Sequence, residues 1–69
     1  MDLRTIRFLK KISQWDLARE TNIAQSKISL AERGYVCLSD YEKSRVSKVL
    51  GFEINQIEWP EPKNNVHAG

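Results

Sequence analysis

The sequence has little cysteine and histidine, and this limits the chemistry that the protein can support. Cys37 is the only cysteine among 69 residues, so the chain cannot form an internal disulfide, and no cluster has the spacing of a zinc site. The one histidine, His67, lies in a polar C-terminal stretch, and no glycine-rich loop suited to phosphate binding is present. These absences predict a protein that is not an enzyme and that holds no metal or cofactor.

Long apolar runs are also missing. No stretch approaches the ~20 apolar residues that cross a membrane, and the first residues do not include the apolar segment of a secretion signal. Because structural disulfides are typical of oxidising compartments, the low cysteine content favours a reducing one. We therefore expect a soluble, cytoplasmic protein that has no membrane partner.

The charge of the chain is small but unevenly placed. The formal net charge is +2, yet residues 1–34 carry seven lysines and arginines against four aspartates and glutamates, and the remaining residues are slightly acidic. A chain of this length forms one small domain. Its basic N-terminal half favours a polyanionic partner.

Apolar spacing and capping residues predict an all-α chain of five short helices. The first helix is expected over residues 3–11. The motif S-Q-W-D at 13–16 resembles a capping box that opens a second helix, and Asn22, which tolerates a left-handed conformation, ends it. Only a few residues separate it from a third helix within residues 23–34, so the two are predicted to form a helix-turn-helix.

The C-terminal half predicts two further helices and a tail. The motif S-D-Y-E at 39–42 is a capping box before a fourth helix, and Gly51 stands where this helix should end. Residues 52–59 are expected to add a fifth, short helical turn. Residues 60–69 contain two prolines and have no apolar period, so the prediction is one domain over residues 1–59 followed by a disordered polar tail.

The predicted third helix has two unlike faces. At about 100° per residue, one stripe is mostly apolar and is expected to face the core: Ala24, Ile28, Ala31 and Glu32. The opposite stripe carries short polar side chains, one leucine and one arginine: Gln25, Ser26, Ser29, Leu30 and Arg33. Such a face suits contact with a flat, polar partner.

Several motifs occur in the order and at the spacing of a known family. They are L-R-x-x-R at 3–7, I-S-Q at 12–14, L-A at 17–18, I-x-Q-S-x-I-S at 23–29, E-R-G at 32–34 and V-S-K-V-L-G at 46–51. With these motifs the chain, from Leu3 to Glu61, resembles the Cro and phage-repressor-like helix-turn-helix family of DNA-binding transcription regulators. The resemblance implies a compact, five-helix, lambda-repressor-like domain whose third helix lies in the major groove of DNA.

The resemblance also implies roles for single residues. It places four residues of the third helix against base edges: Gln25, Ser26, Ser29 and Leu30. Gln25 is the residue expected to bond adenine. Three residues are expected to contact DNA phosphates, namely Gln14 at the start of the second helix and Lys27 and Arg33 beside the base-contacting residues. Arg7 and Glu32 are expected to form a buried ion pair that holds the first helix to the third.

Two apolar sets are expected at protein interfaces. The family commonly dimerises near its fifth helix, which here carries Phe52, Ile57 and Trp59. Phe8, Leu9 and Trp15 are expected on outward faces of the first two helices, where apolar residues indicate a partner surface. The expected function is a repressor that binds an inverted-repeat, double-stranded DNA operator as a homodimer. The alternative is a helix-turn-helix scaffold that mainly binds a protein, as an antitoxin-like or polymerase-binding module, through the second apolar set.

Overall fold

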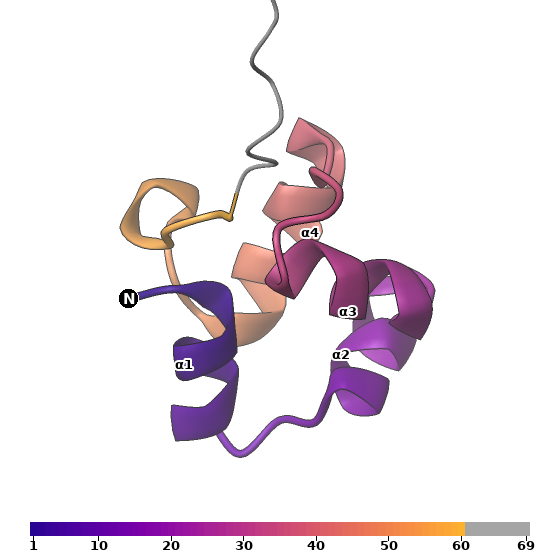
Figure 1. Cartoon of the computed structure of the whole chain (residues 1–69). Helices are drawn as coiled ribbons and strands as arrows, with labels where there is room; N and C mark the ends of the chain where they lie inside the picture. The colour runs from indigo at the N-terminus through magenta and orange to yellow at the C-terminus, as the bar shows by residue number, and fades with distance from the viewer. Residues whose placement is uncertain (61–69) are drawn as a thin grey trace, which may run out of the picture.

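The computed structural model describes residues 1–60, which form four α-helices and no strand (Figure 1). The helices are α1 (Leu3–Leu9), α2 (Gln14–Thr21), α3 (Gln25–Glu32) and α4 (Asp40–Leu50), and a short 3-10 helix, η1 (Ile54–Gln56), follows them. The all-helical class predicted from the sequence is confirmed over these residues. The predicted disordered tail, apart from Pro60, lies outside the described residues.

The predicted fifth α-helix is wrong, because the chain makes only the single 3-10 turn of η1 there. The backbone N–H of Glu53 donates to Gln56 Oε1 at 2.8 Å, and Ile57 has already returned to an extended conformation. The N–H of Glu58 then donates to the carbonyl oxygen of Met1 at 2.9 Å. Since proline disfavours helical backbone in the residue before it, the chain ahead of Pro60 bonds to the N-terminal segment and does not extend a helix.

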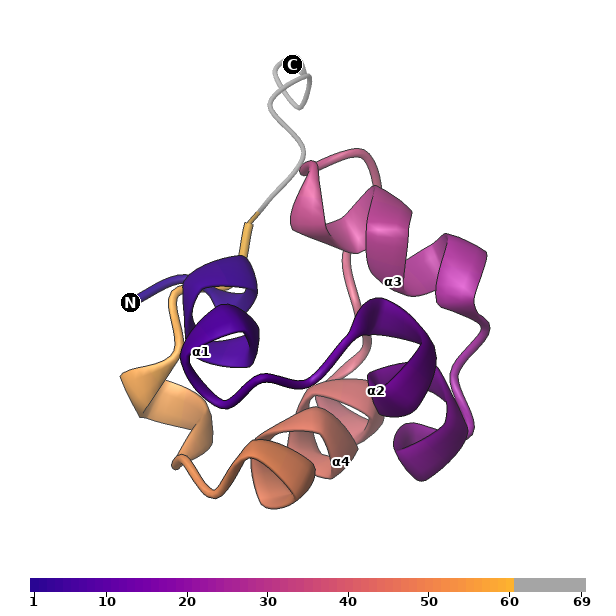
Figure 2. The same cartoon turned by 90° about the horizontal axis from the view of Figure 1, so that it is seen from below.

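Among residues 1–60, ten apolar side chains form the core: Leu3, Ile6, Leu17, Ile23, Ile28, Ala31, Leu38, Val46, Leu50 and Ile57. α2 packs against both α3 and α4, and η1 packs against α4. Figures 1 and 2 place α1 and η1 at one end of the domain and α2 and α3 at the other. Ile57 is only 4% exposed, so the prediction that it forms a protein interface is wrong: its side chain fills the core of its own domain.

The helix caps follow the predicted motifs. Ser13 Oγ accepts the Asp16 N–H at 2.9 Å and Ser39 Oγ accepts the Glu42 N–H at 3.1 Å, so both capping boxes are confirmed. Asn22 ends α2 with a φ of 62°, in the left-handed conformation expected of it. The two serine caps satisfy backbone groups that a helix start leaves without partners, and the left-handed Asn22 turns the chain between α2 and α3.

The first helix is shorter than predicted. α1 ends at Leu9, and Lys11 adopts a φ of 60°. The Ile12 N–H then donates to the Arg7 carbonyl oxygen at 3.0 Å, which closes the end of the helix and directs the chain toward α2. A left-handed backbone in a residue with a side chain costs about 1 kcal/mol, so Lys11 occupies a position that glycine would fill with less strain.

Ala24 also departs from its predicted place in the core. It is exposed at the N-terminal cap of α3, with φ −57° and ψ 138°, and no side-chain hydrogen bond caps the helix. Because this backbone is not helical, the helical period does not determine where Ala24 points. Ile28 and Ala31 are buried as predicted, and Ile23 fills the core beneath the turn between α2 and α3.

Candidate nucleic-acid interface

The outer face of α3 carries the residues that the sequence assigned to DNA. Ser26, Leu30 and Arg33 are exposed, while Gln25 and Ser29 are half-buried. The opposite face is fixed in the core by the two buried apolar residues of α3. α3 therefore presents a face of short polar side chains, with a leucine beside them and an arginine at its C-terminal end.

An ion pair ties α1 to α3 directly beneath this face. Arg7 Nε lies 2.7 Å from Glu32 Oε2, and Arg7 Nη2 lies 3.2 Å from Glu32 Oε1, so the contact is bidentate. The side chains are 14% and 3% exposed, respectively. Arg7 Nη1 also donates to the carbonyl oxygen of Ile12 at 3.0 Å. Arg7 and Glu32 therefore meet as the resemblance implied, and they fix the end of α3 against α1.

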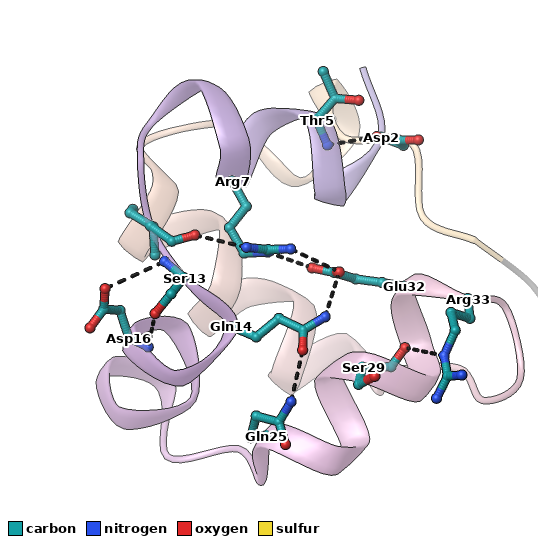
Figure 3. A network of polar contacts seen from close by, with 11 residues as sticks. Asp2, Thr5, Arg7, Ser13, Gln14, Asp16, Gln25, Ser29, Glu32 and Arg33 are labelled. Carbon is teal, nitrogen blue, oxygen red and sulfur yellow. Dashed lines mark hydrogen bonds and ion pairs between the residues drawn. The ribbon is translucent and has the colours of Figure 1, made fainter.

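Glu32 also begins a chain of hydrogen bonds that reaches the outer face of α3 (Figure 3). Gln14 Nε2 donates to Glu32 Oε1 at 2.9 Å, and Gln25 Nε2 donates to Gln14 Oε1 at 2.7 Å. A carboxylate can only accept, so it requires the nitrogen end of the Gln14 amide to face it. The oxygen of Gln14 must then face Gln25, and Gln25 is left with its own oxygen and one N–H for an outside partner.

This chain gives Gln14 a different role from the one expected. The family resemblance implied that Gln14 contacts a DNA phosphate, whereas its half-buried amide lies between Glu32 and Gln25. The Gln14 amide nitrogen carries two N–H groups and uses one for Glu32, so the second could still donate to a phosphate. The side chain therefore supports Gln25 in addition to any contact outside the protein. The helical period could not predict this bond, because Gln14 and Gln25 belong to different helices.

A basic hollow adjoins the face of α3. It is lined by Arg4, Arg7, Gln14, Ser29, Glu32 and Arg33. Arg33 Nε contacts the Ser29 carbonyl oxygen at 3.4 Å, and its guanidinium lies 5.5 Å from the centre of the Tyr35 ring. Arg4 is exposed and forms no ion pair within residues 1–60. Because Glu32 already neutralises Arg7, the hollow keeps the positive charges of Arg4 and Arg33.

Arg4 was missed by reasoning from the sequence. It lies three residues before Arg7, so helical spacing puts the two side chains on neighbouring parts of α1. That signal was present, but only the packing of α1 against α3 brings Arg4 to the same hollow as Arg33.

Lys27, the other expected phosphate contact, is engaged with α4. Its Nζ lies 2.8 Å from Glu42 Oε2, and the pair joins α3 to the first turn of α4. The hydrogen bond from Lys27, together with that from the Ser39 backbone, lowers the pKa of Glu42 below its ordinary value of 4.5. The positive charge of Lys27 is therefore partly neutralised, and its contact with a phosphate stays a prediction.

Acidification should weaken this link between α3 and α4. Because the pKa of Glu42 is lowered in the folded state, its contribution to stability is present above pH 4.5 and is lost as the pH falls through the lower, folded value. Glu42→Gln should therefore unfold more easily than the wild type near neutral pH, and the difference should shrink in acid. Thermal melts over this pH range measure it, with Glu20→Gln, an exposed position on α2, as the control. A difference that is the same at every pH would contradict the assignment.

The two apolar sets expected at protein interfaces differ in their exposure to solvent. Phe8, Leu9 and Trp15 are 79%, 62% and 68% exposed, so their side chains do point outward as expected. Phe52 and Trp59 are only half-buried and pack against the core, and the indole N–H of Trp59 donates to the Ile54 carbonyl oxygen at 3.1 Å. The Trp59 indole is thus held inside its own domain along one edge, and only the rest of its surface could meet a partner.

Comparisons of the chain with family models, with curated proteins and with solved structures found no match. The chemistry of the α3 face is therefore inferred from its own residues. Within residues 1–60, no helix has the length and apolar character that crossing a bilayer requires.

Proposed function

We propose that the protein is a sequence-specific regulator of transcription that binds double-stranded DNA. In this proposal α2 and α3 form a helix-turn-helix, and α3 enters the major groove, which is wide enough to admit a helix. The hydrogen-bonded chain from Glu32 through Gln14 to Gln25 carries the proposal, because it holds an amide in one orientation on an exposed helix face. A fixed amide loses less conformational entropy on binding than one that rotates freely.

The groups left on this face match the major-groove edge of an adenine and thymine pair. Gln25 keeps one acceptor and one donor, which is the pair of groups that adenine N6 and N7 require. Leu30 can pack on the thymine methyl group, and the short side chains of Ser26 and Ser29 allow α3 to approach the groove floor closely. Base recognition is thus assigned to Gln25, with the two serines and Leu30 adding contact.

The positive charges beside α3 suit the phosphate backbone. Arg4 and Arg33 line the hollow that adjoins the α3 face, so one strand of a duplex lying along α3 would pass near both. Their contacts would position the domain without selecting a base. Lys27 would contact a phosphate more weakly than Arg4 and Arg33, because its ammonium group is already paired with Glu42.

Removing Arg4 or Arg33 should therefore reduce the salt dependence of DNA binding. For Arg4→Ala and for Arg33→Ala, the slope of log affinity against log salt concentration should fall by about 0.9, because one phosphate contact is lost in each. Titration of a labelled duplex by fluorescence anisotropy at several salt concentrations measures the slope. Lys48→Ala, an exposed cation on α4, should keep the wild-type slope. Equal slopes in all four proteins would remove Arg4 and Arg33 from the interface.

A homodimer on an inverted repeat is the form of binding that we propose. A domain of this size contacts few bases, and two copies related by a two-fold axis would read two half-sites about one helical turn apart. Phe52 and Trp59 are the proposed contact residues, since both keep part of their surface outside the core. Occupation of the operator would then block transcription, which makes the protein a repressor.

A further inference from the structure

An apolar surface with a basic border lies at the end of α1. We propose that it binds an acidic, aliphatic-rich segment of another protein. The surface, here called the α1-end surface, consists of Phe8, Leu9, Lys11 and Ile12. This inference does not depend on DNA binding.

The α1-end surface is hollowed and open. Phe8 and Leu9 are among the most exposed apolar side chains in residues 1–60. Phe8 also lines a hollow with Arg7, Lys11, Ile12 and Ser13, so its ring forms one wall of a recess. A recess with an aromatic wall can take up an aliphatic side chain, and burial of such a side chain is a favourable contribution to association.

The charge around this surface is of one sign. Residues 3–15 contain four lysines and arginines and no aspartate or glutamate, and of these four only Arg7 forms an ion pair within residues 1–60, with Glu32. The flanking carboxylates are already engaged, since Asp2 accepts the Thr5 N–H at 2.8 Å and Asp16 pairs with Arg19 at 2.9 Å. Lys11 forms no ion pair within residues 1–60. A partner that carries carboxylates beside its apolar residues would be attracted, and a basic one would be repelled.

The backbone of Lys11 is also left-handed. Its φ of 60° is strained for a residue with a side chain, and glycine would relieve the strain. A lysine at this position places a cation on the border of the apolar recess at a cost in stability. The left-handed backbone of Lys11 also ends α1, so the position of the Lys11 ammonium beside the recess is set by the end of the helix.

A second copy of the chain fits this surface less well than an acidic partner. In a two-fold dimer the same patch faces itself, so Lys11 of one copy would approach Lys11 of the other. Like charges brought together in this way oppose association. The recess beside Phe8 and the basic hollow beside α3 share only Arg7 among their lining residues, so the partner and DNA would have separate contact residues.

Selection from a displayed library of random short peptides tests the proposal, with the wild-type protein as bait. The enriched peptides should combine aspartate or glutamate with leucine, isoleucine or valine. Phe8→Ser should weaken the binding of a synthetic enriched peptide by about 10-fold, since an apolar contact is lost. Lys11→Gly should weaken peptide binding by about 3-fold, because the ion pair between Lys11 and an acidic residue of the peptide is lost. The same variant should raise the melting temperature, because glycine adopts the left-handed backbone of this position without strain. Tyr41→Ser, at another exposed aromatic, should leave binding unchanged.

Several results would overturn the proposal. One is enrichment of peptides without acidic residues, or no enrichment at all. Another is peptide binding that Phe8→Ser does not change while its thermal melt shows a folded protein. Phe8-dependent binding to phosphatidylserine vesicles or to a single-stranded oligonucleotide, without peptide binding, would assign the surface to those ligands. Self-association that Phe8→Ser abolishes in sedimentation would assign it to a second copy.

Discussion

Replacing Glu32 with alanine is expected to destabilise the fold by about 3 to 5 kcal/mol, because it leaves the Arg7 guanidinium buried without its counter-ion. The carboxylate also accepts the Gln14 amide, so two side chains lose their acceptor in one substitution. In a domain of this size, such a loss lowers the melting temperature by at least about 12 °C. A thermal melt followed by circular dichroism measures the change.

Glu58→Ala is the matched control for this experiment. Within residues 1–60, Glu58 pairs only with the N-terminal ammonium group, at 3.8 Å, and its side chain is 79% exposed. Exposed pairs contribute about 0 to 1 kcal/mol, so the control should melt close to the wild type. If Glu32→Ala also melts like the wild type, Arg7 and Glu32 do not hold α1 to α3. The proposal that Glu32 orients Gln25 through Gln14 would then be contradicted as well.

Gln25→Ala is expected to weaken binding to the preferred operator by about 1 to 3 kcal/mol, or roughly 5- to 150-fold. It should also remove the preference for adenine at one position of each half-site, because the amide supplies both the donor and the acceptor that read this base. The melting temperature should change much less than in Glu32→Ala, since Gln25 is half-buried and the substitution removes one hydrogen bond between neutral amides. Anisotropy titrations of the operator and of duplexes substituted at that position measure both effects.

Two further variants separate base recognition from general binding. Asn55→Ala removes an exposed amide on η1 and should leave affinity and base preference unchanged. Glu32→Gln keeps the size of the side chain but also removes the charge that pairs with Arg7, so its base preference is measured at a temperature where a thermal melt shows the variant folded. Its amide can present either its oxygen or its nitrogen to Gln14, so the orientation of Gln25 is no longer fixed. This variant should relax the adenine preference. Wild-type base preference in both Gln25→Ala and Glu32→Gln would contradict the role assigned to the hydrogen-bonded chain.

Local sequence signals predicted the parts of the fold that depend on neighbouring residues. The capping boxes at Ser13 and Ser39 and the left-handed Asn22 follow from side chains within three or four residues of a helix end. The two faces of α3 follow from the helical period, which is a property of that segment alone. The prediction of a fifth helix was wrong because the backbone N–H of Glu58 bonds to Met1, and a partner so distant in sequence leaves no local signal.

In the candidate site, too, the sequence predicted some features and could not predict those that depend on how the helices pack. The α3 face and the pair of Arg7 and Glu32 could be proposed from motif spacing, because the spacing carries a family pattern. The bond between Gln14 and Gln25 and the pair of Lys27 and Glu42 could not, since each joins two helices whose side chains meet only after packing. Arg4 likewise acquires its surroundings only when α1 packs against α3, and Lys11 acquires its surroundings from the path of the chain between α1 and α2.

Selection of the purified protein against a randomised duplex library, at about physiological salt, tests the proposed function most directly. We expect enrichment of two inverted half-sites with centres about one helical turn apart, each with an adenine that loses its enrichment when the selection is repeated with Gln25→Ala. A pool without a common sequence, bound only through salt-sensitive contacts, would contradict sequence-specific recognition by α3.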